Sequence, residues 1–221
     1  MWRMRRNNNR AGALKGAAAL LLALAMWAVA PTGARAGEDH AQILAAEILV
    51  TRADLAQIAK PDLPLAHRAG FVERIGGAMG LIPWLLVVAG DEDGAGEAAG
   101  WAVDWSGGPG EVKALDRFLA KLSARHPLDI DAYDIGITHA DLAEARAIHD
   151  AYCAGCHDGE GTGEPDAELV ARDLFWMARD EVPEQFLARL VNGVKGDESI
   201  GFVNPLTTRQ VAALWKLYTF H

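Results

Sequence analysis

Cys153-Ala154-Gly155-Cys156-His157 is the stretch from which the rest of this chain is best understood. Its two cysteines are the only ones among 221 residues. On one helical turn, thiols three positions apart face the same side, so both can bond to one planar group. The histidine that follows can ligate a metal at the centre of that group. Cys-x-x-Cys-His is the spacing of c-type haem attachment. The sequence therefore predicts one covalent haem c, with its iron bound by His157.

Two other uses of the cysteine pair remain open from the residues alone. Zinc takes four ligands, and His149 and His157 could complete a set of two cysteines and two histidines, but not at zinc-finger spacing. A redox-active dithiol usually follows a strand and opens a helix, whereas the residues before Cys153 have a helical pattern. Both alternatives are less favoured than haem.

The first 36 residues have the composition of a secretory signal peptide. The start is basic and carries no acidic residue, and an apolar run follows at 17–30. Ala34-Arg35-Ala36 then offers a cleavage site that leaves Gly37 as the first mature residue. The apolar run is shorter than the roughly 20 residues that span a bilayer, so an uncleaved anchor is only the alternative. In bacteria, haem is attached to this motif outside the cytoplasm, so leader and motif both predict a periplasmic protein.

The net charge of the chain after the leader limits which kinds of partner are expected. Residues 37–221 hold 15 basic and 30 acidic residues, a formal charge of −15. A chain this acidic is not a general nucleic-acid binder. We expect a soluble protein whose redox partner, where charge guides their encounter, presents a basic docking face. Membrane association is expected only through an uncleaved leader.

The segment 37–127 predicts a helical domain of unknown role. Leu44, Ile48, Leu55 and Ile58 recur at helical spacing, and a second helix is expected over 64–89. Its uncharged part, 75–90, suits a buried core helix better than a membrane-surface segment. Glycine and acidic residues at 91–110 predict a loop, with a short strand at 101–105, before an amphipathic helix that ends near residue 126. An acidic linker at 128–137 follows.

The segment 138–221 shows a series of helix signals around the haem motif. In chain order these are a cap at Thr138 and Asp141, an apolar stripe of Leu142, Ala145, Ile148 and Tyr152, a glycine-rich turn at 158–163, Pro183 in the first turn of a middle helix, Gly193 at its end, and a last-helix cap at Thr207 and Gln210. Val211, Leu214, Trp215 and Tyr218 line the inner face of that last helix. This segment resembles a class I monohaem cytochrome c. The resemblance implies a mostly α fold in which the first and last helices cross beside the haem.

Two positions depart from that family. An aromatic residue usually precedes the first cysteine by four positions, where this chain has His149. His149 is either a packing substitute or a group that forms hydrogen bonds or titrates near the haem edge. The family's distal methionine is also missing from the loop at 193–205. The candidates for the sixth ligand are Met177, Lys195, His221, a residue of the N-terminal part, or none.

The resemblance implies electron transfer, and no acid–base pair or nucleophile cluster is visible in the sequence. The missing methionine supports a second hypothesis, a haem protein with an open distal site that binds or turns over NO, CO, oxygen or peroxide. A third hypothesis gives the N-terminal helices the specific task, such as binding a partner enzyme, with the cytochrome as the electron relay.

Overall fold

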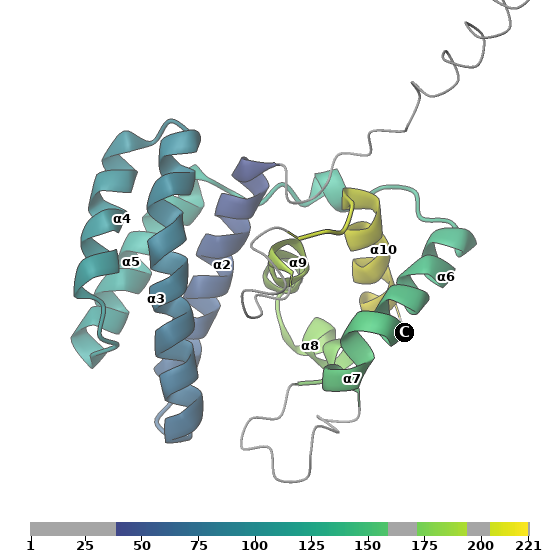
Figure 1. Ribbon diagram of the computed structural model, residues 1–221, viewed down its shortest axis with the longest axis horizontal. Helices are drawn as coiled ribbons and strands as arrows, with labels where there is room; N and C mark the ends of the chain where they lie inside the picture. The colour runs from purple at the N-terminus through teal and green to yellow at the C-terminus, as the bar shows by residue number, and fades with distance from the viewer. Residues whose placement is uncertain (1–38, 159–171, 194–203, 221) are drawn as a thin grey trace, which may run out of the picture. The chain divides into compact units, whose positions relative to one another are not determined.

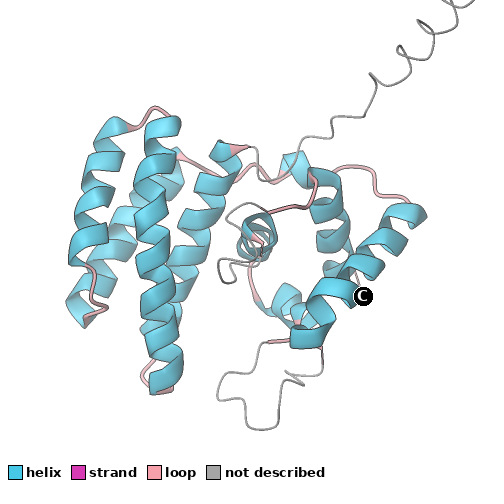
Figure 2. Ribbon diagram, in the orientation of Figure 1, coloured by secondary structure: helices cyan, strands magenta, loops and turns pink. Residues whose placement is uncertain are grey.

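All regular secondary structure in the described residues is helical, which confirms the mostly α fold (Figure 2). The computed structural model describes residues 39–158, 172–193 and 204–220, and these all belong to one compact unit, Ala34–His221. The helices are α2 (His40–Ile58), α3 (Leu65–Val88), α4 (Glu92–Asp104), α5 (Pro109–Arg125), η3 (Asp131–Tyr133), α6 (His139–Ile148), η4 (His149–Cys153), α7 (Ala154–His157), α8 (Leu174–Asp180), α9 (Pro183–Asn192) and α10 (Thr208–Thr219). The leader, most of the glycine-rich turn, Lys195 and His221 lie outside the described residues.

The three helices expected in the N-terminal part are present as α2, α3 and α5. Asp39 caps α2 by accepting hydrogen bonds from the backbone N–H groups of Ala41 and Gln42. α3 continues through Pro83, although proline lacks the backbone N–H that an interior helical position uses.

The segment 91–110 contains α4 and is not the loop with a short strand that its composition predicts. Asp91 caps α4 by accepting a hydrogen bond from the backbone N–H of Gly94 at 2.9 Å. Gly94, Ala95 and Ala98 are buried, and such small side chains let α4 pack closely against α3. The packing of α4 against α3 outweighs the weak helix propensity of its glycines, Gly94, Gly96 and Gly100.

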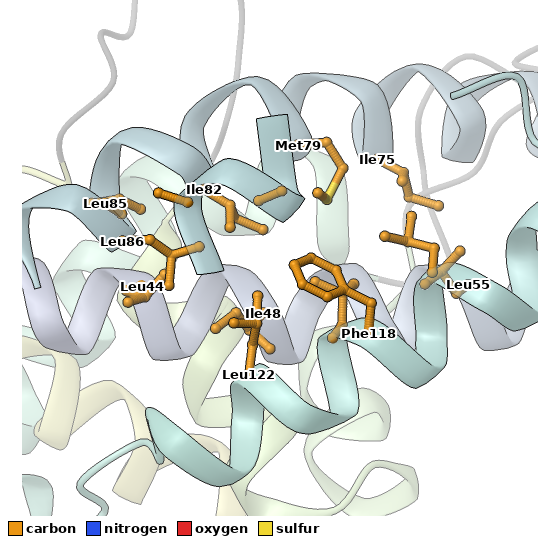
Figure 3. Close-up of a cluster of buried hydrophobic side chains, with 14 of the residues drawn as sticks. Leu44, Ile48, Leu55, Ile75, Met79, Ile82, Leu85, Leu86, Phe118 and Leu122 are labelled. Atoms are coloured by element: carbon orange, nitrogen blue, oxygen red, sulfur yellow. The ribbon is translucent and has the colours of Figure 1, made fainter. Parts of the chain in front are cut away.

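The helices α2–α5 share one hydrophobic core (Figure 3). Its fully buried members include Leu44, Ile48, Ile75, Met79, Ile82, Leu86, Leu115 and Leu119. α3 contributes through one face only, so the predicted helix is present but its uncharged part is not buried all round. Its opposite face leaves Trp84, Val87 and Val88 exposed. By length and composition alone α3 is also apolar enough to cross a membrane, with a mean hydropathy of 1.5 over its most apolar window.

A second face of α2 packs against α9 (Figure 1). Ala46, Leu49 and Val50 of α2 share a cluster with Leu187 and Val191 of α9. α2 therefore belongs to two cores, which explains why its apolar residues are spread around the helix. The predicted division into domains at 37–127 and 138–221, with a linker at 128–137, stays a prediction.

The helix signals of the C-terminal part correspond to observed helix ends. Thr138 with Asp141, and Thr207 with Gln210, form reciprocal capping boxes at the starts of α6 and α10. Pro183 begins α9, and Gly193 ends it with φ +66°, a conformation that favours glycine. α6 and α10 pack against each other.

Candidate functional site

The Cys-x-x-Cys-His motif lies where two short helical segments meet. Cys153 is the last residue of the π-helical turn η4, and Cys156 and His157 lie in the α-helical turn α7. A π-turn holds one residue more than an α-turn, so residues after it are rotated relative to a continuing α-helix. Tyr152 accordingly leaves the apolar stripe expected for α6 and is 80% exposed. Cys153 and Cys156 are not joined in a disulfide bond.

His157 has a defined partner on one ring nitrogen. Its Nδ1 lies 2.6 Å from the backbone carbonyl oxygen of Arg172, immediately before α8. A carbonyl can only accept, so we assign the proton to Nδ1, which leaves the lone pair of Nε2 available. Metal-ligating histidines use this arrangement, because the second-shell carbonyl fixes both the tautomer and the ring orientation.

His149 is buried, with 2% of its surface exposed, and both of its ring nitrogens have partners. Nε2 lies 3.1 Å from a carboxylate oxygen of Asp158, and Nδ1 lies 2.9 Å from the hydroxyl of Tyr218 on α10. The carboxylate accepts, so Nε2 carries a proton, and in the neutral imidazole Nδ1 then accepts from the tyrosine hydroxyl. His149 also packs edge-on against Phe175 and Tyr218. It therefore packs against the last helix, as the first alternative predicted, and also forms hydrogen bonds, while a role near a haem edge stays a prediction.

Tyr218 connects this histidine to the first cysteine. Its hydroxyl is in hydrogen-bond contact with the Cys153 thiol, and its ring packs edge-on against Phe175 and Phe186. Burial raises the pKa of the Cys153 thiol above its usual value, and it also raises the pKa of Tyr218. A redox-active dithiol depends on a lowered thiol pKa, so this environment disfavours that use of the pair.

Ion pairs and caps fix the crossing of α6 and α10. Arg209 contacts Asp141 through two hydrogen bonds of 2.6 Å, and Gln210 donates to Glu144 at 2.6 Å. The Arg209 guanidinium and the Thr138 cap lower the pKa of Asp141 well below its usual range. The helix that leads into the motif is thereby held against the helix that carries Tyr218.

The distal candidates are only partly covered by the described residues. Met177 lies in α8, partly buried in the cluster that contains Phe186, Leu214 and Tyr218. This matches the core packing that its neighbours predicted and leaves its role as a ligand a prediction. No group of three or more histidine, cysteine or acidic side chains placed to hold a metal occurs within residues 39–158, 172–193 and 204–220.

One polar atom of the same cluster is left without a partner. The indole Nε1 of Trp215 is buried and has no hydrogen-bond acceptor in the described part of the chain. A buried N–H group of this kind is available to an acceptor on a bound group.

The sequence did not identify Arg172, Tyr218 and Asp158 as members of this site. Arg172 contributes a backbone carbonyl, which has no signature in the residue type. Tyr218 was expected only as an inner-face residue of the last helix, and its separation of 69 positions from His149 hides the hydrogen bond. Comparison with known proteins adds no relative: no family model, curated protein or solved structure matches this chain.

Proposed function

We propose that this protein is an exported c-type cytochrome that carries one haem, bound through thioether bonds to Cys153 and Cys156, and that transfers electrons to or from a redox partner protein. The observation that carries the proposal is the hydrogen bond from His157 Nδ1 to the Arg172 carbonyl, which leaves Nε2 free to ligate iron. Two further observations support it: Cys153 and Cys156 are not joined in a disulfide bond, and a buried apolar cluster contains the unpartnered indole N–H of Trp215.

Bound haem supplies a one-electron couple between ferric and ferrous iron. The chain's own residues set its conditions. His157 would ligate the iron through Nε2, and the Arg172 carbonyl would hold the imidazole in orientation and increase its basicity. Phe175, Phe186 and Tyr218 pack edge-on in an apolar cluster and would supply apolar surface to a bound haem.

The partner is proposed from charge. The formal charge of −15 on residues 37–221 favours a redox partner with a basic docking face and disfavours nucleic acid. Encounters of electron-transfer proteins are small and transient, so association should weaken as salt is raised. The basic and apolar leader supports a periplasmic location after cleavage at Ala36.

The alternative function is ligand binding at an open distal position. It is favoured by the loop at 193–205, which lacks methionine and histidine. Absorbance spectra with and without CO or cyanide separate the two functions. Rapid ligand binding supports an open site, whereas a methionine-ligated ferric spectrum that is lost in Met177→Ala supports the electron carrier with a methionine ligand.

Covalent attachment is tested with cysteine variants expressed in cells that have haem-ligation machinery. Wild type should keep its haem through denaturing electrophoresis. Cys153→Ala/Cys156→Ala should lose it, because no thioether bond can form. A serine-to-alanine change at Ser123, in α5, is the control and should retain full haem stain. A wild-type protein without haem stain would contradict the proposal.

A further inference from the structure

A chain of ion pairs leads from the N-terminal helices to the residue whose carbonyl holds His157. Asp54 on α2 is its buried member, with a side chain only 1% exposed, and it accepts two hydrogen bonds of 2.5 Å from Arg74 of α3. A carboxylate this deeply buried requires charged partners, because burial removes its hydration.

Asp54 also faces α9, which packs beside α2 (Figure 1). Its carboxylate lies 3.8 Å from the guanidinium of Arg189. Arg189 in turn donates from Nε to Glu181 at 2.9 Å, and the Glu181 side chain is only 8% exposed. The guanidinium of Arg189 thus links Asp54, on the N-terminal helix α2, to Glu181, which lies between α8 and α9.

The chain of contacts ends at the histidine's partner. Glu181 lies 3.7 Å from Arg172, and Arg172 also donates to Asp180 at 2.9 Å. Two carboxylates therefore anchor the side chain of the residue whose carbonyl accepts from His157 Nδ1. The four groups Asp54, Arg189, Glu181 and Arg172 form what we call the ion-pair chain.

We propose that Asp54 and Arg189 are positioning residues for the haem iron, which gives the N-terminal helices a role in setting its reduction potential. The inference rests on the proposed function. A well-placed acceptor at Nδ1 makes the imidazole a stronger donor to iron and favours the ferric state. Disturbing the ion-pair chain should weaken that acceptor and raise the reduction potential.

The direction in which the reduction potential shifts distinguishes a positioning role from the direct electrostatic effect of the removed charge. Asp54→Asn removes a negative charge, which by itself raises the potential, and Arg189→Gln removes a positive charge, which by itself lowers it. Positioning predicts that both variants raise it. We expect the ferrous-to-ferric ratio at a fixed ambient potential to rise about tenfold, which is 59 mV for a one-electron couple. The Nδ1 proton of His157 should also exchange faster with solvent, as followed by NMR.

The control is Arg52→Gln, which breaks the ion pair between Arg52 and Asp116 of α5, outside the ion-pair chain. It should leave the exchange of the Nδ1 proton unchanged. If Asp54→Asn does not accumulate in cells, the direction of the reduction-potential shift in Arg189→Gln is sufficient to test the inference. A lowered or unchanged potential in Arg189→Gln would overturn the inference. Wild type is first checked for covalent haem. If it carries none, the proposed function is wrong as well. If it carries haem and Arg189→Gln has a lowered or unchanged reduction potential, only this inference is wrong.

Discussion

His149 is a buried polar residue that packs against α10 through its ring and also forms hydrogen bonds. Its ring packs edge-on against Phe175 and Tyr218, and its two nitrogens take their partners from Asp158 and Tyr218. A histidine with only one nitrogen paired would leave a buried polar atom unsatisfied, which costs about 1–3 kcal/mol. The pair of His149 and Tyr218 therefore works only as a unit.

A double-mutant cycle tests that unit. His149→Phe leaves the Tyr218 hydroxyl without its acceptor, and Tyr218→Phe leaves Nδ1 without its donor, so each should lower the free energy of unfolding in urea by about 1–3 kcal/mol. The double variant leaves neither group unpaired and should be less destabilised than the sum of the singles by about 0.5–3 kcal/mol. Additive effects of the two changes would mean that no hydrogen bond couples the side chains.

At the level of single helices, α4 depends on a charged cluster at its start. Asp91 caps the helix and accepts hydrogen bonds from Arg125, while the ring of His126 lies 2.9 Å from the same carboxylate. Contacts with His126 and Arg125, together with the Gly94 N–H, lower the pKa of Asp91 to about 2. The C-terminal end of α5 is thus tied to the start of α4.

This lowered pKa gives a pH prediction. The unfolded-state pKa of Asp91 is near 3.8, so its contribution to stability is fully present above that value and is lost as pH falls toward about 2. The difference in free energy of unfolding between wild type and Asp91→Asn should therefore be constant above pH 4–5 and shrink between about pH 4 and 2. Asp93→Asn, exposed in the same helical turn, is the control. A difference that stays constant down to pH 2 would show that the cluster does not form in solution.

At the scale of the whole molecule, α2 is shared between two cores. One face packs with α3 and α5, and another packs with α9. Because a helix cannot lose one of its cores without affecting the other, we expect the N-terminal helices and the C-terminal helices α6–α10 to unfold together.

Leu115→Ala tests this cooperativity. Leu115 of α5 is fully buried in the N-terminal core, so the change should cost about 2–5 kcal/mol. Helix content by circular dichroism and the haem absorbance should both move to lower urea together. Leu65→Ala, at a side chain that is 83% exposed, should move neither. If Leu115→Ala lowered the urea concentration at which helix content is lost but not the one at which the haem absorbance changes, the two parts would be independent domains.

The features that were predictable from the sequence are local ones. Helix periodicity and capping residues act within a few positions, so α2, α3, α5 and the capping boxes of α6 and α10 were found. α4 was missed because its glycine and acidic residues are typical of a loop, and the packing against α3 that holds them in a helix is not visible in the local sequence. The motif residues Cys153, Cys156 and His157 were named from spacing alone, and their attachment to haem remains the proposal.

The rest of the candidate site depends on contacts between distant positions. The Arg172 carbonyl has no residue signature, and Arg189 lies 135 positions from Asp54, so no local pattern joins them. Periodicity could place Tyr218 on the inner face of its helix without naming His149 as its partner. Such pairings arise only from the tertiary packing of α2, α9 and α10.

The most direct test of the account is the intact mass of the exported protein, purified from cells with haem-ligation machinery and measured after denaturation. Two thioether bonds survive unfolding, so the account predicts the mass of residues 37–221 plus one haem and no reaction with a thiol reagent. The mass of the bare chain, with both Cys153 and Cys156 reactive, would contradict it.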